Sequence, residues 1–166
     1  RLDEEAWAQA PPATGFKQRE PQEGAPATDD TEVRLLFDGK NLYVGILARD
    51  GEPDRVIGRI LERDRLIESG ENRSRPSGDD AVLLLLDPFL DRRNAFVFGT
   101  NPNGAEHDAL ITDERESFNT DWRAVWKVAA QRVEGGWSAE FAIPFRSLRY
   151  PRELSVSTME AKARNP

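Results

Sequence analysis

The sequence contains no cysteine among its 166 residues, so disulfide bonds and thiolate chemistry are excluded. Its single histidine, His107, excludes a zinc site built on a histidine cluster. No apolar run approaches the roughly 18 residues that a membrane-spanning helix needs. No signal peptide is recognisable, and because the chain opens inside a motif at Arg1 we expect a mature or trimmed form.

An excess of basic residues is also missing. The chain has 23 Lys and Arg residues against 30 Asp and Glu residues, which gives a formal net charge of −7. This charge would repel a phosphate backbone, so we expect no nucleic-acid partner. Acidic residues are interleaved with the one basic cluster, residues 55–75, which we interpret as a solvated mixed-charge segment.

What the sequence does contain is a series of short apolar segments separated by turns. In residues 31–38, apolar and polar side chains alternate with the period of a half-buried strand. Residues 41–50 are apolar on both faces, which predicts a central strand, and Asp38-Gly39 between the two segments predicts a hairpin turn. Residues 81–88 read as a strand buried on both faces. Further strands are expected within 94–101, 105–112, 122–133 and 137–145.

Six to eight short strands, with a turn about every ten residues, predict an all-β fold, an antiparallel β-sandwich. No long helical crossover supports a parallel sheet. Residues 53–68 have apolar pairs spaced i,i+4, as on one side of a short helix. Residues 2–10 are expected to form a helical turn or an extended lead-in, with Trp7 packed against the main body.

The order of motifs resembles the family 9 carbohydrate-binding module, in the form found at the N-terminus of bacterial outer-membrane-associated proteins of uncertain function. The resemblance covers residues 1–151, and 152–166 are expected to be a tail or loop. The motifs are LDEEAW, EVRLLFDGKNLYVGILARD, DDAVLLLLDPFLDRRNAFVFGTNPNG, W-x-x-x-W and GGWSAEFAIPFRSL.

The resemblance implies a jelly-roll-like sandwich that binds an oligosaccharide or polysaccharide between aromatic side chains. It also implies calcium ions in structural sites. The implied location is extracytoplasmic, in the periplasm, in the outer membrane or secreted, with attachment to an outer-membrane protein. Oxygen-bearing residues lie in two loops, but they do not match the helix–loop–helix calcium motif, so the metal rests on the resemblance alone.

Aromatic side chains are the first candidates for sugar contacts, because the C–H face of a pyranose ring stacks on an indole or phenol. Trp122 and Trp126 would point to one side of an extended strand, but roughly 13 Å apart, too far to hold one ring together. We expect Trp122, which follows a polar loop, to be the exposed platform. Trp126 and Trp137 are expected to be structural, and Tyr43 could be either.

Polar side chains at the predicted strand ends are the second set of candidates, because sugar hydroxyls need hydrogen-bonding partners. Asp and Asn at such positions also stabilise turns through their own backbone, and a lone histidine also occurs on an edge strand. Both interpretations remain open for these residues. The candidate polar contacts are Asp80, Arg92, Asn101 and His107.

We therefore predict a non-catalytic carbohydrate-binding module. The alternative is a structural or protein-interaction domain of an outer-membrane-associated protein that has lost sugar binding; it predicts shielded tryptophans and no exposed aromatic platform. A third alternative is part of a glycoside hydrolase with two catalytic carboxylates. No Gly-x-Ser-x-Gly elbow and no phosphate-binding glycine loop is present, so no catalytic residue is assigned.

Overall fold

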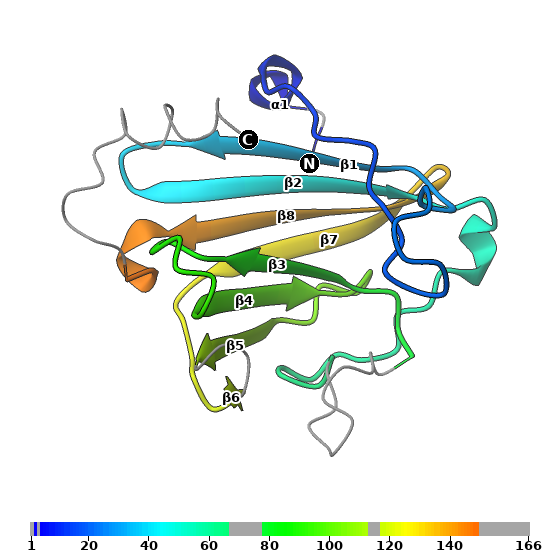
Figure 1. The fold of residues 1–166 in the computed structure, drawn as a ribbon. Helices are drawn as coiled ribbons and strands as arrows, with labels where there is room; N and C mark the ends of the chain where they lie inside the picture. The colour runs from blue at the N-terminus through cyan, green and yellow to red at the C-terminus, as the bar shows by residue number, and fades with distance from the viewer. Residues whose placement is uncertain (1, 3, 67–77, 113–116, 150–166) are drawn as a thin grey trace.

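The computed structural model describes residues 2, 4–66, 78–112 and 117–149 (Figure 1). In this part of the chain, two antiparallel sheets of four strands each form a sandwich. The prediction of an all-β antiparallel sandwich is therefore confirmed. The expected tail, residues 152–166, lies outside the described residues.

Sheet A has the strand order β1-β2-β8-β7, so the first two and the last two strands of the chain share one layer. The predicted hairpin is present: β1 and β2 pair from Thr31–Ala48 to Phe37–Leu42. β2 is central, as its two apolar faces predict, because it pairs with β8 on its other side. The strands are β1 (Thr31–Phe37), β2 (Asn41–Arg49), β7 (Lys127–Val133) and β8 (Gly136–Pro144).

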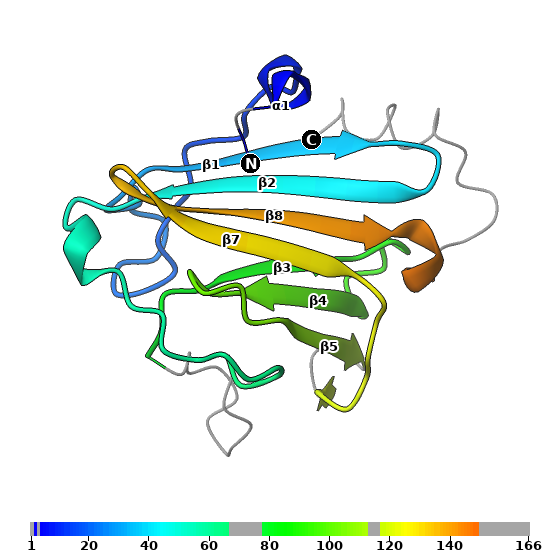
Figure 2. The same cartoon turned by 180° about the vertical axis from the view of Figure 1, so that it is seen from behind.

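Sheet B follows the chain order β3-β4-β5-β6, as a meander of antiparallel neighbours. Figure 2 shows the two layers from behind, with β7 of sheet A in front of β3. The strands are β3 (Val82–Leu86), β4 (Ala95–Thr100), β5 (His107–Thr112) and β6 (Ser117–Asn119).

The core lies between the sheets and contains alternate residues of the central strands. Val44 and Ile46 of β2 and Phe141 and Ile143 of β8 are at most 3% exposed, and Phe98 of β4 faces them at 0%. Tryptophan completes the layer, because the indole of Trp126 stacks on Phe141 with ring centroids 5.8 Å apart. Burying one such side chain contributes about 2 kcal/mol, so this layer dominates the folding free energy.

The edge strands differ from their prediction. Residues 81–88 were predicted to be buried on both faces, yet β3 lies at a sheet edge, and Leu85 is 57% exposed. On β1, Leu35 and Phe37 face the interior side of sheet A but are 58% and 57% exposed. Alternation predicts which side chains share a face, whereas the neighbouring sheet decides how much of that face is covered.

Residues 53–68 were ambiguous from the sequence, and their i,i+4 apolar pairs do not form one side of a helix in the described part, which ends at residue 66. Only η1 (Pro53–Arg55) makes a helical turn, and the described residues after it are irregular. The reason is that the carboxylates of Asp79 and Asp80 accept hydrogen bonds from backbone N–H groups in residues 57–60. These groups are therefore tied to the start of β3 instead of to a helical carbonyl.

The helix α1 (Glu5–Gln9) precedes the sandwich and lies on the outward face of sheet A (Figure 1). Trp7 is only 5% exposed, so the predicted packing of this indole against the main body is confirmed. A second short helix, η3 (Phe145–Ser147), follows β8. Among the described residues, no helix has the length and apolar character needed to cross a membrane.

Candidate functional site

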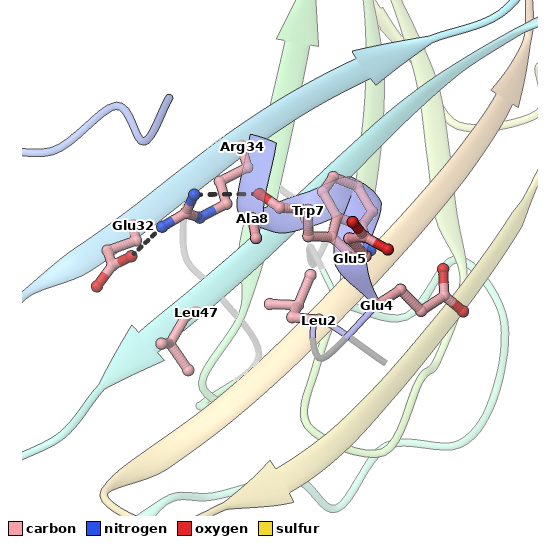
Figure 3. A pocket seen from close by; sticks show the side chains of 9 residues that line it. Leu2, Glu4, Glu5, Trp7, Ala8, Glu32, Arg34 and Leu47 are labelled. Atoms are coloured by element: carbon pink, nitrogen blue, oxygen red, sulfur yellow. Dashed lines mark hydrogen bonds and ion pairs between the residues drawn. The ribbon is translucent and has the colours of Figure 1, made fainter. Parts of the chain in front are cut away.

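A pocket of about 290 Å³ lies between α1 and the outward face of sheet A (Figure 3). Its walls come from the N-terminal segment on one side and from β1 and β2 on the other. The lining residues are Leu2, Glu4, Glu5, Trp7, Ala8, Glu32, Arg34, Gly45 and Leu47.

Glycine at position 45 permits the close approach of α1 to the sheet. A β carbon at Gly45 would lie 2.5 Å from Cδ2 of Leu2 and 3.0 Å from Cζ3 of Trp7. A glycine inside a strand commonly marks such a contact with another part of the chain. The position of Trp7 over β2 therefore depends on the missing side chain.

Arg34 of β1 holds the short helix in place. Its Nη1 donates hydrogen bonds to the carbonyl oxygens of Trp7 at 3.1 Å and Ala10 at 2.6 Å, which lie at the C-terminal end of α1. Its Nη2 pairs with Oε2 of Glu32 at 3.4 Å. A guanidinium satisfies these end carbonyls well, because it offers several donors and a positive charge.

The chemistry of the pocket follows from its composition. Leu2 and Leu47 supply most of the apolar wall, because the indole of Trp7 is only 5% exposed, while Glu4, Glu5 and Glu32 supply carboxylate oxygens. Carboxylates accept hydrogen bonds from hydroxyl or ammonium groups, and apolar wall suits a C–H face. The pocket is therefore suited to a small polyhydroxylated or cationic ligand and not to an anionic one.

A second polar cluster joins residues 57–60 to the sandwich. Oδ2 of Asp79, which is 7% exposed, accepts hydrogen bonds from the N–H groups of Arg59 and Ile60, each at 2.9 Å, and from Nδ2 of Asn101 at 2.8 Å. Burial raises the pKa of Asp79, but these three donors and the charge of Arg59 outweigh it and hold that pKa below 3.8. Its bonds are all internal, so the cluster fixes the loop.

A third cluster surrounds the guanidinium of Arg63. This group pairs with Glu106 and with the fully buried Asp108, and its Nε lies 3.7 Å from Oδ2 of Asp64. The other oxygen of Asp108 accepts the N–H of Ala124 at 2.5 Å. The guanidinium thus occupies the position between these carboxylates.

The calcium that the resemblance implies finds no matching donor set in the part of the chain that is described. No group of three or more His, Cys, Asp or Glu side chains there is arranged to hold a metal ion. The carboxylates of Glu106 and Asp108, which lie at one guanidinium, are paired with Arg63. No calcium site is assigned.

The aromatic candidates occupy two different parts of the molecule. Trp122 is half-buried, with its ring 5.1 Å from that of Phe96, so the expected exposed platform is not free. Trp126 is 5% exposed and belongs to the core, as expected, and so does Trp137 at 4%. Tyr43 lies on the opposite, outward face of sheet A, where its hydroxyl donates to Asp38 and accepts from Asn41.

The polar candidates are also scattered. Asp80 and Asn101 come together, since both hold residues 57–60: Asp80 accepts the N–H of Ile57 at 2.6 Å, and Asn101 donates to the carbonyl of Ile60 at 2.8 Å. Arg92 lies in the turn between β3 and β4. The seven candidate residues therefore do not form one site.

His107 on β5 faces the outside of sheet B but is completely buried. Neither ring nitrogen has a hydrogen-bond partner among the described residues, and the ring stacks on Phe118 with centroids 6.4 Å apart. Burial lowers the pKa of His107 below 6.5, although the charges of Asp64 and Asp108 act in the opposite direction. This environment favours the neutral form of the imidazole over the charged form.

The α1 pocket was not predicted from the sequence, although two signals pointed to it. Trp7 is the only tryptophan in the segment before β1, and Gly45 interrupts an apolar strand. The acidic residues around Trp7 gave no signal, because acidic residues are abundant throughout the chain.

No protein-family model matches the sequence, and no curated protein matches it either. The resemblance to the family 9 carbohydrate-binding module therefore stays a prediction.

Proposed function

We propose that this domain is a non-catalytic carbohydrate-binding module and that the α1 pocket receives the sugar. The observation that carries the proposal is the composition of the pocket, in which two leucine side chains and the small exposed part of the Trp7 indole lie beside three carboxylates. A sugar ring has the matching pattern, with apolar C–H faces and a rim of hydroxyl donors.

The volume of the pocket narrows the proposal to the end of a glycan. About 290 Å³ lies at the lower limit of small-molecule sites, which suits one sugar ring and not a stretch of several. The three lining glutamates, with Arg34 already occupied by backbone carbonyls and Glu32, disfavour uronic acids and sulfated sugars. We therefore expect a neutral or amino sugar at a chain end.

Isothermal titration calorimetry with a panel of neutral, amino and acidic saccharides tests this proposal. Glu5→Gln with Glu32→Gln is expected to weaken binding of the preferred sugar about tenfold, because each substitution removes a negative charge and replaces one acceptor oxygen at the pocket wall by an NH2 donor. Glu134→Gln, in the exposed turn between β7 and β8, is the matched control and should bind as the wild type does. Absence of binding across the panel, or wild-type affinity in the pocket variant, would contradict the proposal.

A second candidate, a structural or protein-interaction domain that has lost sugar binding, is favoured by the tryptophans. Trp7, Trp126 and Trp137 are at most 5% exposed, and Trp122 packs on Phe96 and Phe98. If the saccharide panel gives no heat and a tagged copy of the chain captures one defined protein from its source cells, this candidate replaces the first. The captured protein would then be tested for being an outer-membrane protein.

A further inference from the structure

Four segments meet at one end of the sandwich, which we call the η3 end: the hairpin turn 38–40, the turn 87–94, residues 125–127 and residues 145–149. The N–H of Phe145 donates to the carbonyl of Lys40 at 2.8 Å, and Oγ of Ser147 donates to the carbonyl of Val125 at 2.7 Å. Figures 1 and 2 both place the turn between β3 and β4 beside η3.

Large apolar side chains are exposed at this end. Phe37 is 57% exposed where β1 enters its hairpin, Phe89 and Leu90 are 45% and 56% exposed in the turn, and Val125 is 67% exposed. Single exposed apolar residues are ordinary, but several on neighbouring segments commonly mark an interaction surface.

The turn that presents Phe89 and Leu90 is fixed and strained. Leu90 has φ 54° and Arg92 has φ 60°. Both values lie in the left-handed region, which residues other than glycine and asparagine seldom adopt. The carboxylate of Asp87 accepts the N–H groups of Phe89, Asp91 and Arg92 and thereby holds this conformation. Strain that is retained in this way, with an apolar pair at the tip, commonly accompanies function.

The charge of the η3 end is opposite to that of the whole chain. Its four segments contain six basic and three acidic residues, whereas the formal net charge of the chain is −7. The three acidic residues are turn acceptors: N–H groups of Lys40 and Asn41 lower the pKa of Asp38, and those of Arg93 and Asn94 lower the pKa of Asp91. The basic residues are Lys40, Arg92, Arg93, Lys127, Arg146 and Arg149.

We propose that the η3 end docks on an anionic lipid surface, with Phe89 and Leu90 inserted among the headgroups and the basic residues against the lipid charges. Both attractions are needed in this arrangement: apolar insertion anchors the tip, and each nearby Lys or Arg adds electrostatic affinity. The acidic remainder of the domain is repelled by the same surface, which would orient this end toward it. Figure 1 shows α1, which lines the pocket, well apart from η3, so this inference is independent of sugar binding.

Co-sedimentation of the whole chain with vesicles tests the proposal. We expect binding to vesicles of equal parts phosphatidylcholine and phosphatidylglycerol, weaker binding as salt is raised, and little binding to phosphatidylcholine alone. Phe89→Ser with Leu90→Gly should reduce binding about tenfold or more. Because glycine relieves the positive φ at position 90, this variant should fold at least as well as the wild type, which thermal melting would verify.

Two further variants separate the contributions. Arg92→Gln with Arg146→Gln should lower binding and flatten its salt dependence, whereas Leu61→Ser, which changes a 75% exposed side chain outside the η3 end, should have no effect. The proposal is overturned if the wild type ignores anionic vesicles or if the Phe89/Leu90 variant binds them equally well. It is also overturned if the apolar tip instead mediates self-association, seen as concentration-dependent sedimentation without vesicles that the same variant abolishes.

Discussion

Replacement of Gly45 by alanine inserts one methyl group where α1 meets sheet A. The new β carbon would lie 2.5 Å from Cδ2 of Leu2 and 3.0–3.1 Å from two ring carbons of Trp7. Leu2 can move, since its contact is the end of a flexible side chain. Trp7 is 5% exposed, and its ring must shift by a few tenths of an ångström or lift α1 from the sheet.

The expected loss of stability is modest because two effects oppose each other. Overpacking of a well-filled site costs about 1–3 kcal/mol. Replacing glycine restricts the unfolded chain and returns about 0.4–1 kcal/mol, provided the native backbone accepts alanine. The net expectation is therefore a decrease of about 1 kcal/mol in the free energy of unfolding, together with a partly filled pocket and weaker sugar binding.

Urea denaturation followed by tryptophan fluorescence measures this change, and calorimetry measures sugar affinity. Gly39→Ala is the matched control, because a β carbon there meets no heavy atom within 4 Å, and its stability should be unchanged or slightly higher. If Gly45→Ala is as stable as Gly39→Ala and binds sugar like the wild type, the close packing of Trp7 on β2 and the pocket that depends on it are refuted.

Three further predictions concern the polar and aromatic interior. Asp79→Ala should lower the free energy of unfolding by about 3 kcal/mol, because three donors lose their acceptor. Asp79→Asn should retain most of the stability. Urea denaturation compares the two variants, and equal losses would contradict the hydrogen bonds assigned to Asp79. His107 has a lowered pKa in the folded chain, so below the ordinary value of 6.5 the unfolded chain binds more protons than the folded one. The free energy of unfolding should therefore fall as the pH drops below 6.5. A flat profile of urea midpoints from pH 7 to pH 5 would contradict a lowered pKa for this buried imidazole. Iodide should quench little of the total tryptophan fluorescence, and Trp122→Phe should remove most of the quenchable part; strong quenching that persists in this variant would mean that another indole is exposed.

Local alternation was sufficient to predict most strands. The β1–β2 hairpin and the strands β4 and β5 lie within the segments expected for them, and β8 begins one residue before its expected segment. Segment 122–133 was only partly right, because the strand begins at Lys127, after Trp126 has turned its ring against Phe98 and Phe141. An amphipathic pattern records which side chains become buried, but it does not distinguish a strand from an irregular segment that buries the same residues.

The candidate site was far less predictable than the fold. Asn101 and Asp79 lie 22 residues apart in sequence and meet through a hydrogen bond, and Trp7 meets Gly45 across an even longer separation. Such contacts are set by how distant segments pack, which no local pattern encodes. Exposed aromatic residues were expected to reveal the ligand site, yet in this sandwich the indoles of Trp122 and Trp126 serve the core because both pack on Phe98.

The most direct test of the central claim is an NMR titration of the ¹⁵N-labelled chain with the neutral and amino saccharides of the panel. Sugar binding in the α1 pocket predicts saturable shifts of backbone amides at Ala8, Gly45 and Leu47, with little change near Trp122. Shifts confined to residues around Trp122, or no saturable shift with any saccharide, would contradict the assignment of the α1 pocket as a sugar site.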